Sequence, residues 1–120
     1  MDDIYLLAGQ LPRSEDFNLK SQITRAAVSI ALNIAEGSTG QSDPEQARFL
    51  GMAIRSLIET IACQHLIRSR KYLSDETSLD AVYLKSQTLA RKLQAFRKSL
   101  STPRNIQEES APYSINADDL

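Results

Sequence analysis

Ser29-Ile30-Ala31-Leu32-Asn33-Ile34-Ala35-Glu36-Gly37 forms the centre of a helical segment that is apolar on more than one face. It carries one amide and one carboxylate and ends in glycine. Between residues 23 and 35 the polar positions are few, namely Thr24, Arg25, Ser29 and Asn33. A surface helix has one apolar stripe, whereas a helix that is apolar nearly all round is buried on more than one side. The run therefore predicts a helix that packs inside a bundle on one face and against neighbouring subunits on another.

Glycine, proline and clusters of polar residues divide the chain into four helical segments. We expect helices at about 3–11, 19–36, 44–70 and 77–100. Gly37 is placed as the C-terminal cap of the second helix. The run Asp43-Pro44-Glu45-Gln46 predicts the start of the third, with aspartate as N-cap, proline in the first turn and glutamine at N3.

The fourth segment shows the seam of a bundle helix, because its core positions alternate at spacings of three and four. These positions are Leu79, Val82, Ser86, Leu89, Leu93, Phe96 and Leu100. Short connections make consecutive helices antiparallel neighbours. The pattern therefore predicts an all-α fold, an antiparallel up-down-up-down four-helix bundle, as one domain over residues 1–101. Residues 102–120 are predicted to be an acidic, flexible tail.

Residues 22–37 read Gln-Ile-Thr-Arg-Ala-Ala-Val-Ser-Ile-Ala-Leu-Asn-Ile-Ala-Glu-Gly. They resemble the signature Gln-Ile-x-x-Ala-Ala-x-Ser-Ile-x-x-Asn-Ile-Ala-Glu-Gly of the 23S rRNA intervening sequence protein family, whose members are four-helix bundles. The matching positions are Gln22, Ile23, Ala26, Ala27, Ser29, Ile30, Asn33, Ile34, Ala35, Glu36 and Gly37. The similarity covers about residues 11–100 and continues at Arg48-Phe49-Leu50, Ala53, Ser56-Leu57 and Glu59. Arg55 departs from the pattern, because the family usually has glycine there.

The resemblance implies a fold and an assembly but no reaction, since the family has no established activity. Relatives resemble pentameric rings, and a similarity to the accessory variability proteins of diversity-generating retroelements suggests a nucleic-acid role. The family's first helix is about twice as long as the shortened first helix expected here. The missing turns would lie beside the end of the second helix and the start of the third. There the residues expected to lose their cover are Ile30, Ile34, Phe49 and Leu50.

The acidic tail is one candidate for covering this gap. The fourth helix ends at the same pole, and Tyr113 and Ile115 are the large apolar residues that follow Pro112. We expect either this tail or a neighbouring subunit to cover the gap. The alternative is a tail that stays in solvent, as its polar composition favours.

Composition is that of an ordinary globular protein, with 42% apolar and 24% charged residues. Uncharged stretches fall well short of the roughly 20 residues of a membrane span, and no signal segment opens the chain. Cys63 has no second cysteine to pair with, which agrees with a reducing compartment. We therefore expect a cytoplasmic protein without membrane contact.

Charge is distributed unevenly along the chain, although the net charge is only −1. Residues 103–120 carry −3 and residues 1–102 carry +2. Residues 81–100 contain no acidic residue, whereas ordinary exposed faces mix both signs. We identify a candidate nucleic-acid-binding stripe formed by Arg68, Arg70, Lys71, Lys85, Arg91, Lys92 and Lys98. Tyr72 and Tyr83 would stack bases beside it; the alternative is a solvated helix face with both tyrosines packed in the bundle.

Asn33 and Glu36 lie three residues apart on one helical face. Glu36 opposes the helix dipole in the last turn, a penalty of roughly 0.3–1 kcal/mol at an exposed site. We infer an ion pair between Glu36 and Arg48 across the short loop. The polar motif of Ser29, Asn33, Glu36, Gly37 and Arg48 then has two readings. It either satisfies buried groups and fixes the register of the bundle, or it forms a polar site at a subunit interface that solvent reaches at Glu36.

Catalytic and metal-binding patterns have little support in this sequence. Cys63 and His65 differ by two positions, about 200° around a helix, and cannot share one metal. Gly40-Gln41-Ser42 lacks the second glycine of a nucleophile elbow, and the loop that contains it lacks the lysine of a phosphate loop. An enzyme would depend on Glu36 and Arg48 as its only plausible centre. We therefore expect no catalytic residue, metal, cofactor or small-molecule substrate.

Two functions of different classes remain after these exclusions. We expect a non-catalytic homo-oligomeric helical scaffold or adaptor, for which the resemblance favours a pentamer, with further copies of the same chain as partners. Val28, Leu32 and Ala35 are its candidate interface residues. The alternative is an RNA- or nucleic-acid-binding accessory protein of a reverse transcriptase or an rRNA-related system. It would use the basic face of the fourth helix, and its partner would be RNA or a nucleic-acid enzyme.

Overall fold

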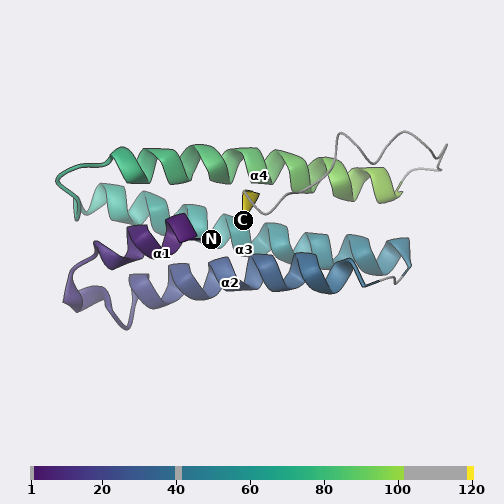
Figure 1. Cartoon of the computed structure of the whole chain (residues 1–120), viewed down its shortest axis with the longest axis horizontal. Helices are drawn as coiled ribbons and strands as arrows, with labels where there is room; N and C mark the ends of the chain where they lie inside the picture. The colour runs from purple at the N-terminus through teal and green to yellow at the C-terminus, as the bar shows by residue number, and fades with distance from the viewer. Residues whose placement is uncertain (1, 40–41, 102–118) are drawn as a thin grey trace.

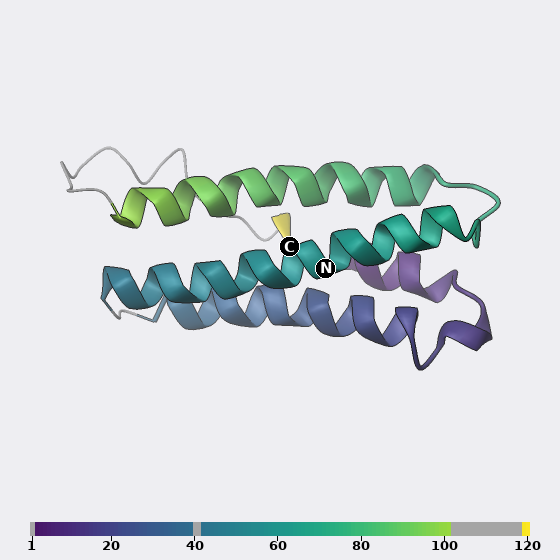
Figure 2. The ribbon, with the colours of Figure 1, turned by 180° about the vertical axis from the view of Figure 1, so that it is seen from behind.

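The computed structural model describes residues 2–39, 42–101 and 119–120 (Figure 1). Within these ranges it contains the short 3-10 helix η1 (Arg13–Glu15) and four α-helices, α1 (Asp2–Gly9), α2 (Leu19–Gly37), α3 (Asp43–Ser69) and α4 (Thr77–Ser101). Consecutive helices pack against each other, and α1 also contacts α4. Views from both sides show the three long helices lying along the molecule, with α3 antiparallel to α2 and to α4 (Figure 1, Figure 2). The predicted all-α bundle with a shortened first helix is confirmed.

The start of α3 differs by one residue from the prediction. Ser42, not Asp43, is the N-cap, and its hydroxyl oxygen accepts a hydrogen bond from the backbone N–H of Glu45 at 3.4 Å. Asp43 and Pro44 fall in the first turn, where a carboxylate complements the helix dipole and a missing N–H costs nothing. Serine and aspartate are equally good N-caps, so the pattern alone does not choose between adjacent residues.

Gly37 belongs to α2 itself, so its predicted role as a cap beyond the helix is wrong. The capping residue is Ser38, with a φ of −89°. A Cβ atom added to Gly37 would lie 3.0 Å from the Cβ atom of Phe49. Glycine allows the end of α2 to approach α3 closely at this position.

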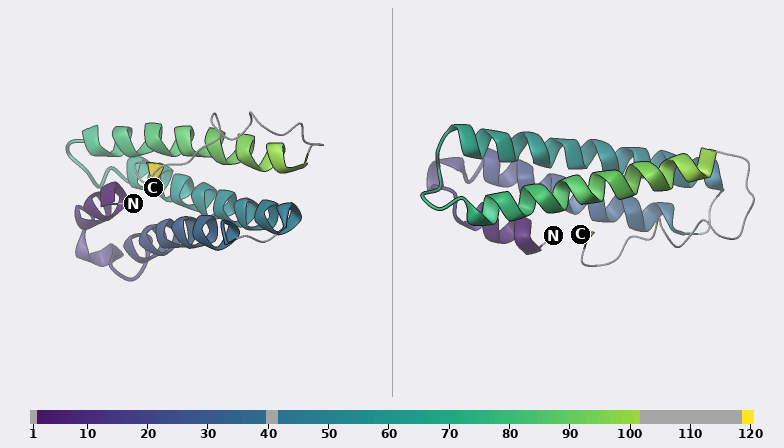
Figure 3. Two further views of the ribbon diagram at one scale, coloured as in Figure 1. Left: turned by 45° about the vertical axis from the view of Figure 1, so that its right-hand side comes forward. Right: turned by 90° about the horizontal axis from the view of Figure 1, so that it is seen from above.

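The buried apolar residues form two clusters along the bundle. The first lies where α1 packs on the other helices and includes Leu7 and Ile67. The second includes Leu50 and Leu93 and is built from α2, α3 and α4. Figure 3 shows α1 confined to one end of the molecule, with its first residues near the middle. The fourth side of the second cluster therefore lacks a helix.

The gap beside the second cluster is partly covered by the last residues of the chain. Leu120 packs against this cluster, which contains Ile30 and Leu50. Both residues are buried, at 6% and 1% exposed, in a structure in which a residue of the tail, Leu120, lies against the cluster. The three long helices enclose Leu50, and Leu120 packs beside Ile30.

Ile34 and Phe49 are the other two residues that were expected to lose their cover, and both are half-buried. Tyr113 and Ile115, the tail residues expected to provide the cover, lie outside the described residues. The part of the tail that the structure places in the gap is the pair Asp119 and Leu120.

Candidate functional site

The outer face of α2 carries the predicted interface residues. Val28, Leu32 and Ala35 follow one another at spacings of four and three, which places them on one side of the helix. Leu32 is 64% exposed, Ala35 is exposed and Val28 is half-buried. The opposite side holds Ile23 and Ile30 in the core. α2 is thus apolar both on its buried face and on a face open to solvent.

Several exposed apolar side chains in the N-terminal part were not predicted. Phe17, between η1 and α2, is 99% exposed, and Tyr5 and Leu6 are exposed on α1. Phe17 belongs to no periodic segment, so the sequence carries no signal for its exposure. These side chains add exposed apolar surface outside the outer face of α2.

Two residues of the predicted polar motif act together between α2 and α3. The side-chain amide of Asn33 donates to the carbonyl oxygen of Ser29 at 2.9 Å and to its Oγ at 3.1 Å. Ser29 Oγ in turn lies 2.8 Å from Ser56 Oγ, in a hydrogen bond between the two helices. These half-buried groups satisfy one another, which supports the reading that they fix the register of α2 against α3.

Glu36 and Arg48 do not form the predicted ion pair. Arg48 Nε donates to Oε1 of Glu45 at 2.7 Å, and its guanidinium lies 4.7 Å from the centroid of the Phe49 ring. Glu45 is three residues earlier in the same helix, so Arg48 reaches it without crossing the loop. The hydrogen bond to Glu45 raises the pKa of Arg48. Glu36 is exposed and forms no ion pair with Arg48.

Residues of the predicted basic stripe on α4 pair with carboxylates from distant parts of the chain. Lys85 Nζ lies 2.8 Å from a carboxylate oxygen of Asp3 on α1. Lys92 Nζ lies 2.9 Å from Asp119. Arg91 donates to Thr88 Oγ1 at 3.3 Å. The acidic partners were missed because they lie outside the segment 81–100.

At the end of α3, the arginine residues of the predicted stripe also pair with carboxylates. Arg68 donates to Glu76 at 2.8 Å and to Asp80 at 2.6 Å, and these carboxylates, Asp80 foremost, raise the pKa of Arg68. Arg70 Nη1 lies 3.3 Å from Glu15. Lys71 is exposed with a φ of 56°. In the described part of the chain, at least four of the seven stripe residues thus pair with a carboxylate, and the stripe carries less net positive charge than its sequence suggests.

A buried carboxylate was not predicted at the pole where η1 meets the α3–α4 connection. Glu15 is 5% exposed. It accepts hydrogen bonds from Tyr72 Oη at 2.5 Å, Arg70 Nη1 at 3.3 Å, Asn18 Nδ2 at 3.0 Å and the backbone N–H of Leu19 at 3.2 Å. These donors, led by the Tyr72 hydroxyl, lower the pKa of Glu15. The contact of Glu15 with Leu19 is local, four residues along the chain, whereas the fold alone brings in Arg70 and Tyr72.

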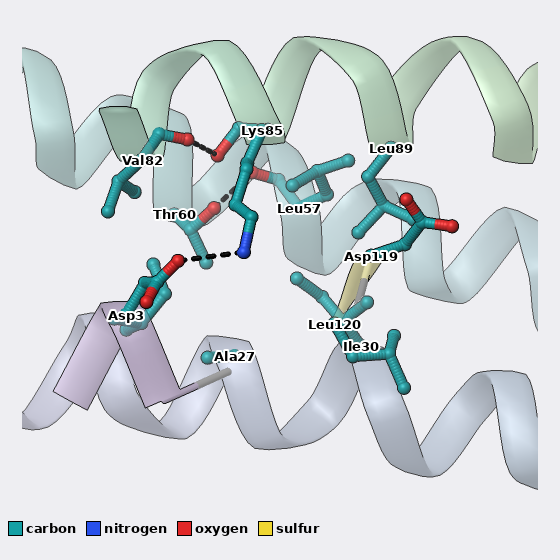
Figure 4. A pocket seen from close by; sticks show the side chains of 12 residues that line it. Asp3, Ala27, Ile30, Leu57, Thr60, Val82, Lys85, Leu89, Asp119 and Leu120 are labelled. Carbon is teal, nitrogen blue, oxygen red and sulfur yellow. Dashed lines mark hydrogen bonds and ion pairs between the residues drawn. The ribbon is translucent and has the colours of Figure 1, made fainter. Parts of the chain in front are cut away.

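A small cavity lies between the start of α1 and the C-terminal residues (Figure 4). Apolar side chains such as Ile30 and Leu89 line it, together with Leu120 and the ion pair of Asp3 and Lys85. Its volume is about 50 Å³. This space holds only a few water molecules, whereas sites for small-molecule ligands measure roughly 300–1,000 Å³. The cavity is therefore a feature of packing between chain segments and not a substrate pocket.

In residues 2–39, 42–101 and 119–120, no helix is both long and apolar enough to span a membrane. The same residues contain no group of three His, Cys, Asp or Glu side chains that could hold a metal ion.

Comparison with known proteins identifies the family. No curated protein and no solved structure matches the chain. A family model described as 23S rRNA-intervening sequence protein matches residues 1–95, which include α1, α2, α3 and most of α4. The protein therefore belongs to the 23S rRNA-intervening sequence protein family.

Proposed function

We propose that this protein is a non-catalytic helical scaffold or adaptor that assembles with copies of itself. The resemblance to the family favours a pentamer. The observation that carries the proposal is the outer face of α2, where Leu32 is 64% exposed between Val28 and Ala35. A helix that already buries one apolar face gains stability when a neighbouring subunit covers the second.

The contact needs more than these three side chains. Burying one leucine contributes about 1.5–3 kcal/mol, whereas a stable interface covers about 800 Å² on each partner. Closed rings use head-to-tail contacts between two different surfaces of each subunit. The exposed side chains of Tyr5, Leu6 and Phe17 offer such a second apolar surface. We therefore propose that the α2 face of one subunit packs on the N-terminal part of the next.

Leu32→Glu tests this assembly by size-exclusion chromatography with light scattering. The wild-type protein is expected to run as an oligomer and the variant as a smaller species with an unchanged helical circular-dichroism spectrum, because Leu32 is not in the core. Leu84→Glu is the matched control, since Leu84 on α4 is also 64% exposed. An oligomer that survives Leu32→Glu, or that Leu84→Glu disrupts equally, would contradict the proposed interface.

A nucleic-acid-binding accessory function is the second candidate, for which the observation is that Arg91 and Lys98 are exposed on α4. The ion pairs of Arg68, Arg70, Lys85 and Lys92 weaken this candidate, because cations held by carboxylates release few counterions from RNA. Recording absorbance at 260 and 280 nm during the same chromatography tests it, because the chain has four tyrosines and no tryptophan. Bound RNA would raise the 260/280 ratio until nuclease is added.

Charge reversal then locates any such binding. Arg91→Glu combined with Lys98→Glu is expected to abolish RNA binding and to leave the assembly intact. Reversal of Lys85 and Lys92 as well would test the whole stripe, although it also breaks the pairs with Asp3 and Asp119. RNA binding that survives all four changes would exclude α4 as the surface.

A further inference from the structure

The groove between α2 and α4 is filled by two segments from opposite ends of the chain. α1 has 8 residues and α4 has 25, so α1 covers only one part of the groove. The labels of the N- and C-terminal ends lie close together near the middle of the molecule in several views (Figure 1, Figure 3). Ile4 of α1 and Leu120 line the same cavity (Figure 4). Leu120 thus continues the row of apolar side chains that α1 places in the groove.

The C-terminal pair is held at two points of different chemistry. Leu120 packs against the second apolar cluster, beside Ile30 and Leu89. The Asp119 carboxylate receives hydrogen bonds from Lys92 Nζ at 2.9 and 3.1 Å. The side chain of Asp119 is only 15% exposed in this pair. An apolar pocket next to a half-buried cation selects an acidic residue followed by a large apolar one.

We infer that this groove is a peptide-docking site, and that its ligand is the chain's own Asp119-Leu120 pair, bound within the same subunit. The pair takes the place of the missing turns of α1. Only two contacts hold these residues, the ion pair of Asp119 with Lys92 and the packing of Leu120 on the second cluster. Asp119 and Leu120 can therefore leave the groove, and a peptide with the same two residues can bind in their place. This site is separate from the outer face of α2 and does not depend on the proposed assembly.

Chain length favours docking within one subunit. Lys92 and the end of α4 at Ser101 are about 14 Å apart at 1.5 Å per residue. Residues 102–118 have a maximum reach of roughly 55–60 Å, so the tail reaches the groove of its own subunit with length to spare. A tethered ligand is present at an effective concentration of about a millimolar. A tail from a second copy at micromolar concentration competes poorly with it.

A peptide-binding experiment tests the inference with full-length protein. The probe is a fluorescein-labelled peptide with the sequence of residues 112–120, and binding is measured by fluorescence anisotropy. The test variant combines Asp119→Lys with Leu120→Asp, which removes both anchors and empties the groove. We expect the probe to bind this variant at least tenfold more tightly than the wild-type protein, in which the tail competes. Equal affinity for the two proteins, or no binding to either, would overturn the inference.

Matched substitutions assign the binding to the two anchor points. Lys92→Glu in the same variant should abolish probe binding, and a probe with lysine in place of Asp119 should restore it. Arg91→Glu makes the same charge change one position away on an exposed face and should leave binding unchanged. Loss of binding in both variants, or in neither, would show that Lys92 does not hold the ligand.

Light scattering separates docking within a subunit from exchange between subunits. If the tail docks in its own subunit, the variant with Asp119→Lys and Leu120→Asp keeps the mass of the wild-type protein. A lower mass would mean that the tail of a neighbouring subunit fills the groove, which would overturn the assignment to the same subunit. Leu32→Glu serves as the comparison, because its effect on mass reports the α2 interface and leaves the groove intact.

Discussion

A single carboxylate, that of Glu15, connects η1, the start of α2 and the α3–α4 connection. Its pKa is lowered chiefly by the hydrogen bond from Tyr72. A carboxylate whose pKa is lower in the folded protein than in the unfolded one adds stability above the unfolded-state value. That stability is lost as the pH falls through the folded-state value. Glu15 therefore stabilises the fold at neutral pH, and this contribution declines in acid, from a pH of roughly 4.3 downward.

Glu15→Gln is expected to lower the urea midpoint of unfolding at pH 7 and to flatten the loss of stability below a pH of about 4.3. The amide keeps the shape of the carboxylate but carries no charge and presents donors to Tyr72 and Arg70. Urea titrations followed by circular dichroism between pH 3 and 7 measure both effects.

Asp16→Asn is the control for Glu15→Gln. Asp16 pairs with Lys20 at 3.3 Å in a half-buried position near the surface. Its loss should cost at most about 1 kcal/mol. Equal effects of the two substitutions would contradict a special role for Glu15. Tyr72→Phe removes the leading donor, and it should move the acid-induced loss of stability to higher pH.

The packing of α2 on α3 depends on a glycine at their closest approach. Gly37→Ala would place a methyl group 3.0 Å from the Cβ atom of Phe49, an atom that no side-chain rotation can move away. Alanine gains roughly 0.5–1 kcal/mol within a helix, but overpacking costs roughly 1–3 kcal/mol. We expect a net loss of about 1 kcal/mol, measured as the free energy of unfolding in urea.

Gly9→Ala provides the matched control for Gly37→Ala. A Cβ atom at Gly9 meets nothing within 4 Å, so only the favourable effect of alanine remains. This variant should be as stable as the wild-type protein or up to about 1 kcal/mol more stable. If Gly37→Ala were equally stabilising, the close contact with Phe49 would not constrain the helices.

Helix positions were predictable because each long helix carries its own periodic signal. The seam from Leu79 to Leu100 and the motif at 22–37 placed α4 and α2 within one residue of their observed ends. Partners across elements were not predictable, since they depend on how the helices are rotated about their axes. Instead of Glu36, Arg48 pairs with Glu45, which the i,i+3 spacing within α3 already made available.

The candidate surfaces show the same difference between positions within one helix, which were predictable, and partners from other segments, which were not. The exposed position of Leu32 followed from a helix with more apolar residues than one core face needs. The pairs of Lys85 with Asp3 and of Lys92 with Asp119 could not be read from α4, because both carboxylates arrive from segments far away in the chain.

Across the whole molecule, local stability differs between the helices, and α1 is the least stable of them. α1 has only 8 residues, and isolated helices shorter than about 12–15 residues are marginal in water. Ile4 and Leu7 hold it in the first cluster, and the pair of Asp3 with Lys85 holds it to α4. α1 should therefore open locally far more often than α3, which lies between α2 and α4.

Hydrogen exchange measured by mass spectrometry checks this order of opening. Amides of α1 should exchange fastest among the four helices and those of α3 slowest. Lys85→Gln should accelerate exchange in α1 by up to about fivefold, the effect of an ion pair worth up to 1 kcal/mol. Exchange in α3 should not change, and Arg91→Gln should affect neither helix. Simultaneous exchange of α1 and α3 would instead indicate one cooperative unit.

The close pairing of α2 with α3 also sets an order of events during folding. Gly37 meets Phe49, and Ser29 meets Ser56, across a connection at residues 38–42. Such contacts close short loops and form early, whereas Leu120 reaches Ile30 from the far end of the sequence. The α2–α3 hairpin is thus expected to be structured in the transition state. The docked tail joins after the barrier, so weakening it should speed unfolding and leave the folding rate unchanged.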